Sequence, residues 1–294
     1  MSIQWFPGHM VTAYKKAAET MEFIDVVIEV LDARAPAASQ NPMIKELGAA
    51  RQRASLKILN KSDLADPKIT EAWIQYFNKL PHTKATPISC KKVNEPKKIF
   101  KLCQLLAPHR GTPLKPLRMM IMGVPNVGKS TLMNTLINKR IAKVGDEPAI
   151  TKQQQRHEIN DSMILIDTPG MMWPKINLDL DGYLLASNNA IGKNAYFEEE
   201  VAEKLGDILL RNYPQSLKLR YKLGNLDIDG VALLEEIAKT KKFMRKNQFV
   251  DLERAAALLI NDYRQGMLGR ISLESPQSRA LLTLLDQHDL LIQK

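Results

Sequence analysis

The chain of 294 residues is 45% hydrophobic and 25% charged, and 42 Lys and Arg against 32 Asp and Glu give a formal net charge of +10. This composition supports one large core or two smaller ones and excludes a wholly disordered or collagen-like chain. Two cysteines exclude a disulfide framework and a four-cysteine zinc site. Because no apolar run approaches the ~20 residues that span a bilayer and the start lacks a signal-peptide pattern, we expect a cytoplasmic protein with no membrane partner. The positive excess favours a polyanionic partner.

The first 170 residues alternate predicted helices with predicted strands. Apolar spacing predicts helices at about 11–23, 42–50, 69–79, 97–106 and 129–138. Apolar or β-branched runs predict strands at 24–31, 55–59, 86–89, 117–122 and 163–166. This alternation predicts an α/β domain with a mostly parallel sheet, in which ligands bind beyond the carboxyl ends of the strands.

The pattern changes after about residue 178. Helical apolar spacing recurs at 198–210, 233–244, 251–265 and 278–291, and β-branched runs vanish. We therefore expect an α/β domain over residues 1–178, followed by a smaller all-α domain over 179–294.

A phosphate-binding motif follows the strand predicted at 117–122. Residues 123–130, GVPNVGKS, match the pattern G-x-x-x-x-G-K-[ST] between a strand and a helix. The glycines let backbone N–H groups approach phosphate oxygens, Lys129 supplies a charge for the outer phosphates, and the Ser130 hydroxyl can coordinate Mg²⁺. These roles predict a nucleotide contact surface made of Asn126, Val127, Gly128, Lys129, Ser130 and Thr131.

A second acidic motif, Asp167-Thr-Pro-Gly170, follows the strand predicted at 163–166. Asp167 would hold the metal directly or through water, and the Gly170 N–H would contact the terminal phosphate. The string is weak by itself because Asp and Gly are common turn residues. Its position about forty residues after the phosphate loop makes it specific.

Residues 60–63, Asn-Lys-Ser-Asp, follow the strand predicted at 55–59 and indicate a guanine site. The Asp63 carboxylate can accept hydrogen bonds from the ring N–H and the exocyclic amine of guanine, a pair that adenine does not offer. Asn60 would brace the loop, the Lys61 stem would cover one face of the base, and Ser62 lies between Lys61 and Asp63 in the same nucleotide-binding string. Ser89 and Cys90 follow the next strand, where a backbone N–H would reach the guanine oxygen.

The order of these motifs is unusual, because the base-reading residues precede the phosphate loop in the chain. A site depends on its arrangement in space, so a chain cut elsewhere can still assemble it. The arrangement resembles a circularly permuted P-loop GTPase. The last switch motif then lies just before the point where the chain enters the helical part, so the nucleotide state could pass directly to that part.

With its opening motif at 5–10, WFPGHM, the Asp32-Ala-Arg34 string and the closing stretch at 261–271, NDYRQGMLGRI, the chain is similar to the ribosome biogenesis GTPase A family (YlqF type). The resemblance covers nearly the whole chain. It implies a permuted GTPase domain, a helical RNA-contacting domain, and GTP hydrolysis coupled to late maturation of the large ribosomal subunit. The expected partners are that subunit and its rRNA, the expected cofactors are GTP or GDP with Mg²⁺, and we expect a monomer.

The resemblance also implies roles for three further residues. Met171 stands where many GTPases place a glutamine that orients the attacking water, and the family assigns this role to the histidine of the opening motif, here His9. Asn126 matches an asparagine that accompanies a K⁺ ion, and Thr151 matches the threonine that completes the Mg²⁺ shell. His9 could instead close the turn at 7–8 or touch RNA, and Asn126 could only brace the loop.

Basic residues in the helical part suggest RNA contacts. Two runs, 218–222 and 239–246, mix cations with an aromatic residue, although a solvated helix face is an equal alternative for either run alone. The candidates are Lys218, Arg220, Lys222, Lys241, Lys242, Arg245 and Lys246, together with Arg264 and Arg270. Two other functions remain open: a nucleotide-gated RNA-binding chaperone with little hydrolysis of its own, and a phosphate-loop ATPase or kinase, which leaves residues 60–63 unexplained.

Overall fold

The structure is a computed structural model that describes residues 3–6, 8–92, 95, 96, 98–137, 154–246 and 249–282. In its first part, the strands are β1 (Val26–Asp32), β2 (Ala54–Asn60), β3 (Thr83–Pro87), β4 (Leu117–Met122), β5 (Gln155–Asn160) and β6 (Met163–Asp167). The helices between them are α1 (His9–Met21), α2 (Pro42–Ala50), α3 (Pro67–Asn78), α4 (Lys98–Leu106) and α5 (Lys129–Ile137).

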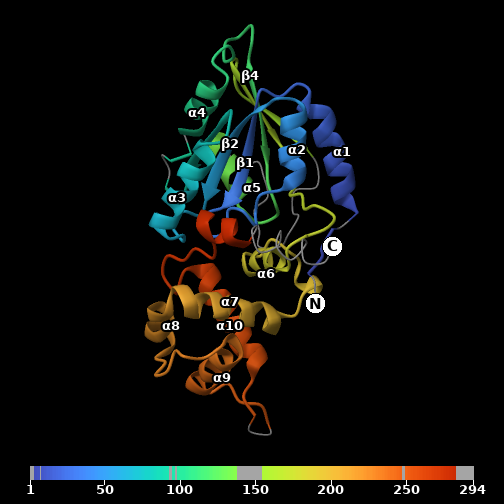
Figure 1. The fold of residues 1–294 in the computed structure, drawn as a ribbon. Helices are drawn as coiled ribbons and strands as arrows, with labels where there is room; N and C mark the ends of the chain where they lie inside the picture. The colour runs from blue at the N-terminus through green and yellow to red at the C-terminus, as the bar shows by residue number, and fades with distance from the viewer. Residues whose placement is uncertain are drawn as a thin grey trace, which may run out of the picture.

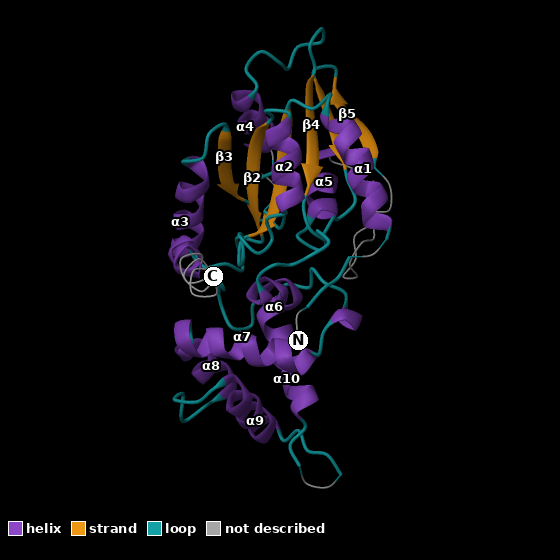
Figure 2. Ribbon diagram, turned by 45° about the vertical axis from the view of Figure 1, so that its right-hand side comes forward, coloured by secondary structure: helices purple, strands orange, loops and turns teal. Residues whose placement is uncertain are grey.

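The strands form one sheet in the order β3-β2-β1-β4-β6-β5. Every neighbouring pair is parallel except β5 with β6, so the prediction of an α/β fold with a mostly parallel sheet is confirmed. Buried side chains of α1, α2 and α3 pack on one face of the sheet, and those of α4 and α5 pack on the other. The result is a three-layer arrangement (Figure 2).

The second part is built from helices, which Figure 1 shows beyond the lower edge of the sheet. Among the described residues after β6, the elements are α6 (Asp179–Ser187), a 3₁₀ turn η1 (Lys193–Ala195), α7 (Glu198–Asn212), α8 (Pro214–Tyr221), α9 (Gly230–Lys241) and α10 (Leu252–Gln265). Helix α6 begins at Asp179, and the division of the chain into two domains at residue 178 stays a prediction. No helix in the described ranges is long and apolar enough to cross a membrane.

Strand β5 and helices α6 and α8 were not predicted from the sequence, and β3 begins at Thr83, three residues before the strand predicted at 86–89. The edge strand β5 was not predicted because its residues are mostly polar and alternate between exposed and half-buried positions. Helices α6 and α8 are short, and each has a weak amphipathic pattern. Of the helix predicted at 278–291, residues after 282 lie outside the described part of the chain.

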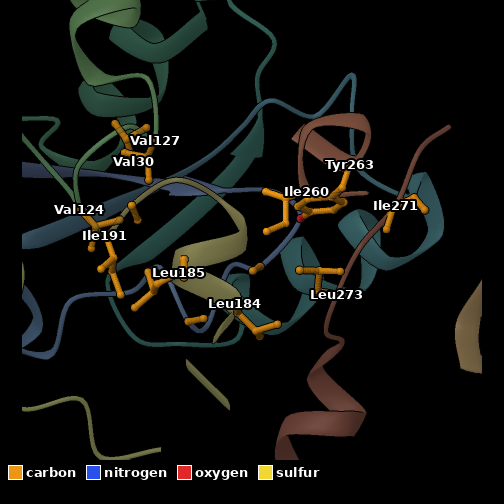
Figure 3. Packing of buried hydrophobic residues seen from close by; sticks show 14 of the residues in the cluster. Val30, Val124, Val127, Leu184, Leu185, Ile191, Ile260, Tyr263, Ile271 and Leu273 are labelled. Carbon is orange, nitrogen blue, oxygen red and sulfur yellow. The ribbon is translucent and has the colours of Figure 1, made fainter. Parts of the chain in front are cut away.

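One hydrophobic core continues from the sheet into the helical part. Val124 and Val127 of the phosphate loop belong to the same buried cluster as Leu184 and Leu185 of α6 and Ile191. Figure 3 shows these side chains pointing toward one another, with Ile260, Tyr263, Ile271 and Leu273 in the continuation of the cluster. The helical part therefore packs against the sheet edge that carries the predicted site.

Candidate nucleotide-binding site

The predicted site segments meet at one edge of the sheet, because each follows or ends a parallel strand. Asp32, Asn60 and Asp167 are the last residues of β1, β2 and β6. Residues 88–90 follow β3, and the phosphate loop, residues 123–130, follows β4. In Figure 2 the arrowheads of β2, β3 and β4 point toward the helical part. The motifs that are out of their usual order in the chain are thus neighbours in space.

The phosphate loop has the close backbone approaches that require glycine. Gly123 has a φ of +150°, and an added Cβ would lie 2.5 Å from the carbonyl oxygen of Val30. At Gly128, where φ is +95°, a Cβ would lie 2.3 Å from the side-chain nitrogen of Asn60. Both positions therefore exclude larger residues.

The motif at 167–170 packs directly against the phosphate loop. The Thr168 hydroxyl donates to the carbonyl oxygen of Ile121 at 2.8 Å, and the Met171 N–H donates to Gly123 O at 3.2 Å. A Cβ at Gly170 would lie 3.0 Å from Cα of Pro125. This contact places the backbone of Gly170 beside the loop that would hold the phosphates.

Lys129 and Asp167 are both buried in this cradle. The Lys129 ammonium donates to Gly123 O at 2.9 Å and to Val124 O at 2.7 Å. Burial lowers the pKa of Lys129 to about 8, although the Asp167 carboxylate opposes the change. Burial likewise raises the pKa of Asp167 to about 6, against the attraction of Lys129 and a backbone hydrogen bond from Thr168. Both ions are thus desolvated without full compensation.

The residues present fit a Mg²⁺ ion. Oδ1 of Asp167 is buried and has no hydrogen-bond partner among the described residues. A hard cation prefers such an oxygen, and Ser130, the second residue of α5, carries the hydroxyl that this motif offers to Mg²⁺. No cluster of three His, Cys, Asp or Glu exists in the described ranges, so a dedicated protein-only metal cage is not found there.

Asn60 joins the base-reading loop, which we define as residues 60–66, to the phosphate loop. Its side-chain amide donates to the carbonyl oxygen of Val127 at 2.7 Å and accepts a contact from the Cys90 thiol at 3.4 Å. Ser62 N–H donates to Ile88 O at 3.2 Å, which ties the same loop to residues 88–90. The base and phosphate ends of the site are therefore one connected unit.

Asp63 is the partly exposed carboxylate of the base-reading loop, and it forms a 2.8 Å ion pair with the Lys91 ammonium. Burial alone would raise its pKa, but hydrogen bonds from the Lys91 and Ser89 side chains outweigh that effect and hold the pKa below its usual range. Asp63 is therefore ionised at neutral pH. The Ser89 N–H donates to the Glu95 carboxylate at 2.8 Å and is therefore already used. Of the two backbone N–H groups, we accordingly expect that of Cys90 to donate to the guanine oxygen.

The Cys90 thiol has its pKa raised to about 11 by burial and by the Asp63 charge. A raised pKa disfavours the thiolate. The structure thus supports a packing role for this side chain.

Sequence reasoning missed the role of Asp32 and Arg34. The Arg34 guanidinium is buried and donates to both carboxylate oxygens of Asp32, at 3.0 and 2.9 Å. The Lys61 ammonium donates to the same carboxylate at 2.9 Å. Burial opposes ionisation of Asp32, but the two cations hold its pKa far below the usual range. The signal was present, since Asp32 directly ends a predicted strand at the edge that carries the site.

Comparisons with known proteins agree with this geometry. A family profile described as 50S ribosome-binding GTPase matches residues 118–196. The chain is 38% identical to the ribosome biogenesis GTPase A of Bacillus cereus, over 94% of this chain and 95% of that protein. The chain belongs to the ribosome biogenesis GTPase A family. The protein of that name from Bacillus licheniformis is 36% identical, over 94% of this chain and 99% of the relative.

A solved structure described as GDP-bound TM YlqF has a TM-score of 0.66 and 24% identity, and covers 89% of this chain and 99% of that one. This likeness concerns the fold. Together with the family membership, it confirms the GTPase domain predicted from the permuted motifs.

In this GTPase, hydrogen bonds from two other parts of the chain hold the segment after residue 170. Met171 is buried, and its carbonyl oxygen accepts a 2.8 Å hydrogen bond from the Asn41 side chain. The Met172 N–H donates to the sulfur of Met10 at 3.3 Å. The Met171 side chain is thus directed into the core and away from the role of a water-orienting group.

Two predicted residues lie outside what the structure describes. His9 is the first residue of α1, but its side chain is not among the described ones, and Thr151 falls in the range 138–153. The Asn126 side-chain nitrogen donates to the carbonyl oxygen of Asn189 at 2.8 Å, which links the phosphate loop to the end of α6. The expected K⁺ contact of Asn126 would have to use its amide oxygen, and it stays a prediction.

The basic residues of the helical part fall into two groups. In the two runs, the exposed candidates are Lys218, Lys222, Lys241, Lys242, Arg245 and Lys246, and Arg245 also forms ion pairs with Asp251 and Glu253 at 3.7 and 3.6 Å. Arg220, in contrast, forms two hydrogen bonds with Asp262, at 2.8 and 2.9 Å. Of the two aromatic residues in the runs, Tyr221 is buried and donates to Asp262, and Phe243 lies under the Arg254 guanidinium at 4.4 Å. The run at 239–246 also continues past the end of α9, so Arg245 and Lys246 lie beyond the helix.

Arg264 and Arg270 contact the protein's own backbone. The Arg264 guanidinium donates to the carbonyl oxygens of Ser187 and Ala186, at 2.9 and 2.7 Å, in the last turn of α6. Arg270 donates to carbonyl oxygens of the base-reading loop. The geometry favours internal roles for both, and we leave them out of the RNA contacts proposed below.

Proposed function

We propose that this GTPase binds GTP and Mg²⁺ at the sheet edge, hydrolyses GTP to GDP and phosphate, and couples this cycle to late assembly of the large ribosomal subunit. The observation that carries the proposal is the convergence of the base-reading loop, the phosphate loop and residues 167–170 in one connected unit. The family profile and the curated relatives support the ribosomal part, because their names refer to 50S binding and ribosome biogenesis.

Each element of the site has a defined task in this proposal. Asp63 accepts the guanine N–H groups, the phosphate loop donates backbone N–H groups to the phosphates, and Lys129 compensates their charge. Ser130 and Asp167 hold Mg²⁺, with Thr151 completing the set. Mg²⁺ supplies positive charge where negative charge develops on the phosphate oxygens.

His9 is the proposed group that orients the attacking water. Two observations support it: Met171 is buried, and Met10, the neighbour of His9, contacts the segment that follows residue 170 through its sulfur. An imidazole with a pKa near 6.5 can accept a hydrogen bond or a proton from water. A K⁺ ion beside Asn126 would add positive charge at the phosphates.

The exposed cations of the helical part are the proposed rRNA contacts. Lys241, Lys242, Arg245 and Lys246 surround the end of α9, and the side chain of Phe249 nearby is 69% exposed. Cations can neutralise phosphates, and an exposed aromatic ring can stack on an unpaired base. In this proposal residues 179–294 form the RNA-binding domain, and the protein acts as a cytoplasmic monomer.

Sedimentation with ribosomal subunits tests the proposal. We expect co-sedimentation with the large subunit in GTP or a non-hydrolysable analogue, weaker association in GDP, and subunit-stimulated turnover that is lost in His9→Ala. Association that ignores the nucleotide would contradict the coupling. Unchanged stimulated turnover in His9→Ala would contradict the role of His9, and nucleotide-dependent association without stimulated turnover in the unchanged protein would favour the chaperone alternative.

The salt dependence of RNA binding tests the contact surface. A variant with Lys241, Lys242, Arg245 and Lys246 changed to Gln should give a flatter plot of log affinity against log salt, because each lost phosphate contact reduces the slope by about 0.7 to 0.9. Arg211→Gln, an exposed change on α7, is the control. A slope equal to that of the control would show that these cations do not contact phosphate.

A further inference from the structure

Arg270, at the start of the segment that follows α10, holds both ends of the turn that carries Asp63. Its Nη2 donates to the carbonyl oxygen of Ser62 at 3.0 Å, and its Nε donates to that of Ala65 at 2.9 Å. One planar guanidinium thus spans the turn with two hydrogen bonds in fixed relative geometry.

The next two residues continue the same contact through the backbone. The Ile271 N–H donates to the carbonyl oxygen of Leu64 at 2.9 Å, and the Ser272 hydroxyl accepts from the Asp66 N–H at 3.1 Å. Ile271 and Ser272 are buried. The segment 270–272 therefore holds the backbone of the base-reading loop at residues 62, 64, 65 and 66, and the residue enclosed by these contacts is Asp63.

A second, indirect contact links the same loop to the end of α10 through Arg34 and Asp32. Arg34, which shares the Asp32 carboxylate with Lys61, has its guanidinium 4.7 Å from the ring centroid of Tyr263 and donates to Tyr263 O at 3.4 Å. Lys61 and Asp63 thus both depend on residues of the helical part for their position.

We propose that Arg270 is a positioning residue for guanine recognition, which holds the Asp63 carboxylate at the angle needed to accept two hydrogen bonds from the base. This inference rests on the proposed guanine site. A carboxylate on an unsupported turn can still accept one hydrogen bond, but the second requires a fixed orientation. The helical part therefore contributes to nucleotide specificity without touching the nucleotide.

The test compares GDP with inosine diphosphate, which keeps the ring N–H but lacks the exocyclic amine. We expect the unchanged protein to bind GDP at least about tenfold more tightly than inosine diphosphate, because the inosine complex lacks one hydrogen bond to the carboxylate. In Arg270→Gln we expect this preference to fall at least about threefold. Arg270→Lys should also lose most of the preference for GDP, because an ammonium keeps the charge but cannot make both hydrogen bonds in the geometry of a guanidinium. Arg211→Gln is the matched control on the same part of the chain.

The outcomes separate this inference from the proposed function. Equal affinity of the unchanged protein for the two nucleotides would contradict the guanine site itself. If Arg270→Gln keeps the preference of the unchanged protein for GDP over inosine diphosphate, the inference about Arg270 is wrong and the guanine site stands. A uniform loss of affinity, with the preference intact, would also overturn it, because a purely structural arginine would act equally on both nucleotides.

Discussion

At the scale of single residues, the site combines charges that are costly in the absence of a ligand. Lys129 and Asp167 are buried beside each other with shifted pKa values, and one Asp167 oxygen has no described partner. Proteins tolerate such groups where a ligand compensates them. Their positions at the carboxyl ends of the strands could be predicted from the sequence, because the motifs fix both residue type and spacing.

Asp63 provides the sharpest test at this scale. We expect Asp63→Asn to weaken GDP binding by about 100-fold and to improve binding of xanthosine diphosphate, because an amide donates where the 2-oxo group of xanthine accepts. Competition between the two nucleotides for a fluorescent analogue measures this change. If Asp63→Asn keeps the preference of the unchanged protein for GDP, the assignment of this residue is wrong.

At the scale of elements, the buried strands and most of their helices could be predicted from the sequence, and the contacts between elements could not. Glu29 of β1 and Lys57 of β2 face each other in register and form a buried ion pair. A second Glu29 oxygen accepts the Asn41 N–H at 2.9 Å, and the Asn41 side chain holds Met171 O. A charged residue within a predicted strand does not reveal its partner. This series of contacts from the sheet to the segment after residue 170 could therefore be found only in the structure.

Removing one partner of the Glu29–Lys57 pair should destabilise the fold. We expect Lys57→Met to lower the free energy of unfolding by about 3 kcal/mol, because it leaves a buried carboxylate without its cation. Lys68→Met, at an exposed position of α3, is the control and should change it by less than about 0.5 kcal/mol. Urea denaturation measures both variants. Equal effects would show that the pair contributes nothing to stability.

At the scale of the whole molecule, the helical part packs against the candidate nucleotide site rather than standing apart from it. Asn126 of the phosphate loop contacts Asn189 after α6, Arg264 caps the end of α6, and Arg270 holds the base-reading loop. The sequence predicted a helical part but grouped Arg264 and Arg270 with the candidate RNA contacts, because a guanidinium that binds the protein's own carbonyls has no distinct local signal. By linkage, RNA that shifts the helical part would also change nucleotide affinity.

A titration of the unchanged protein with GDP and with ADP in Mg²⁺ tests most simply whether the permuted motifs build one guanine site. We predict one equivalent of bound GDP and no displacement by ADP at equal concentration. Displacement by ADP at similar concentration would contradict it, because the carboxylate of Asp63 would then not be reading the base.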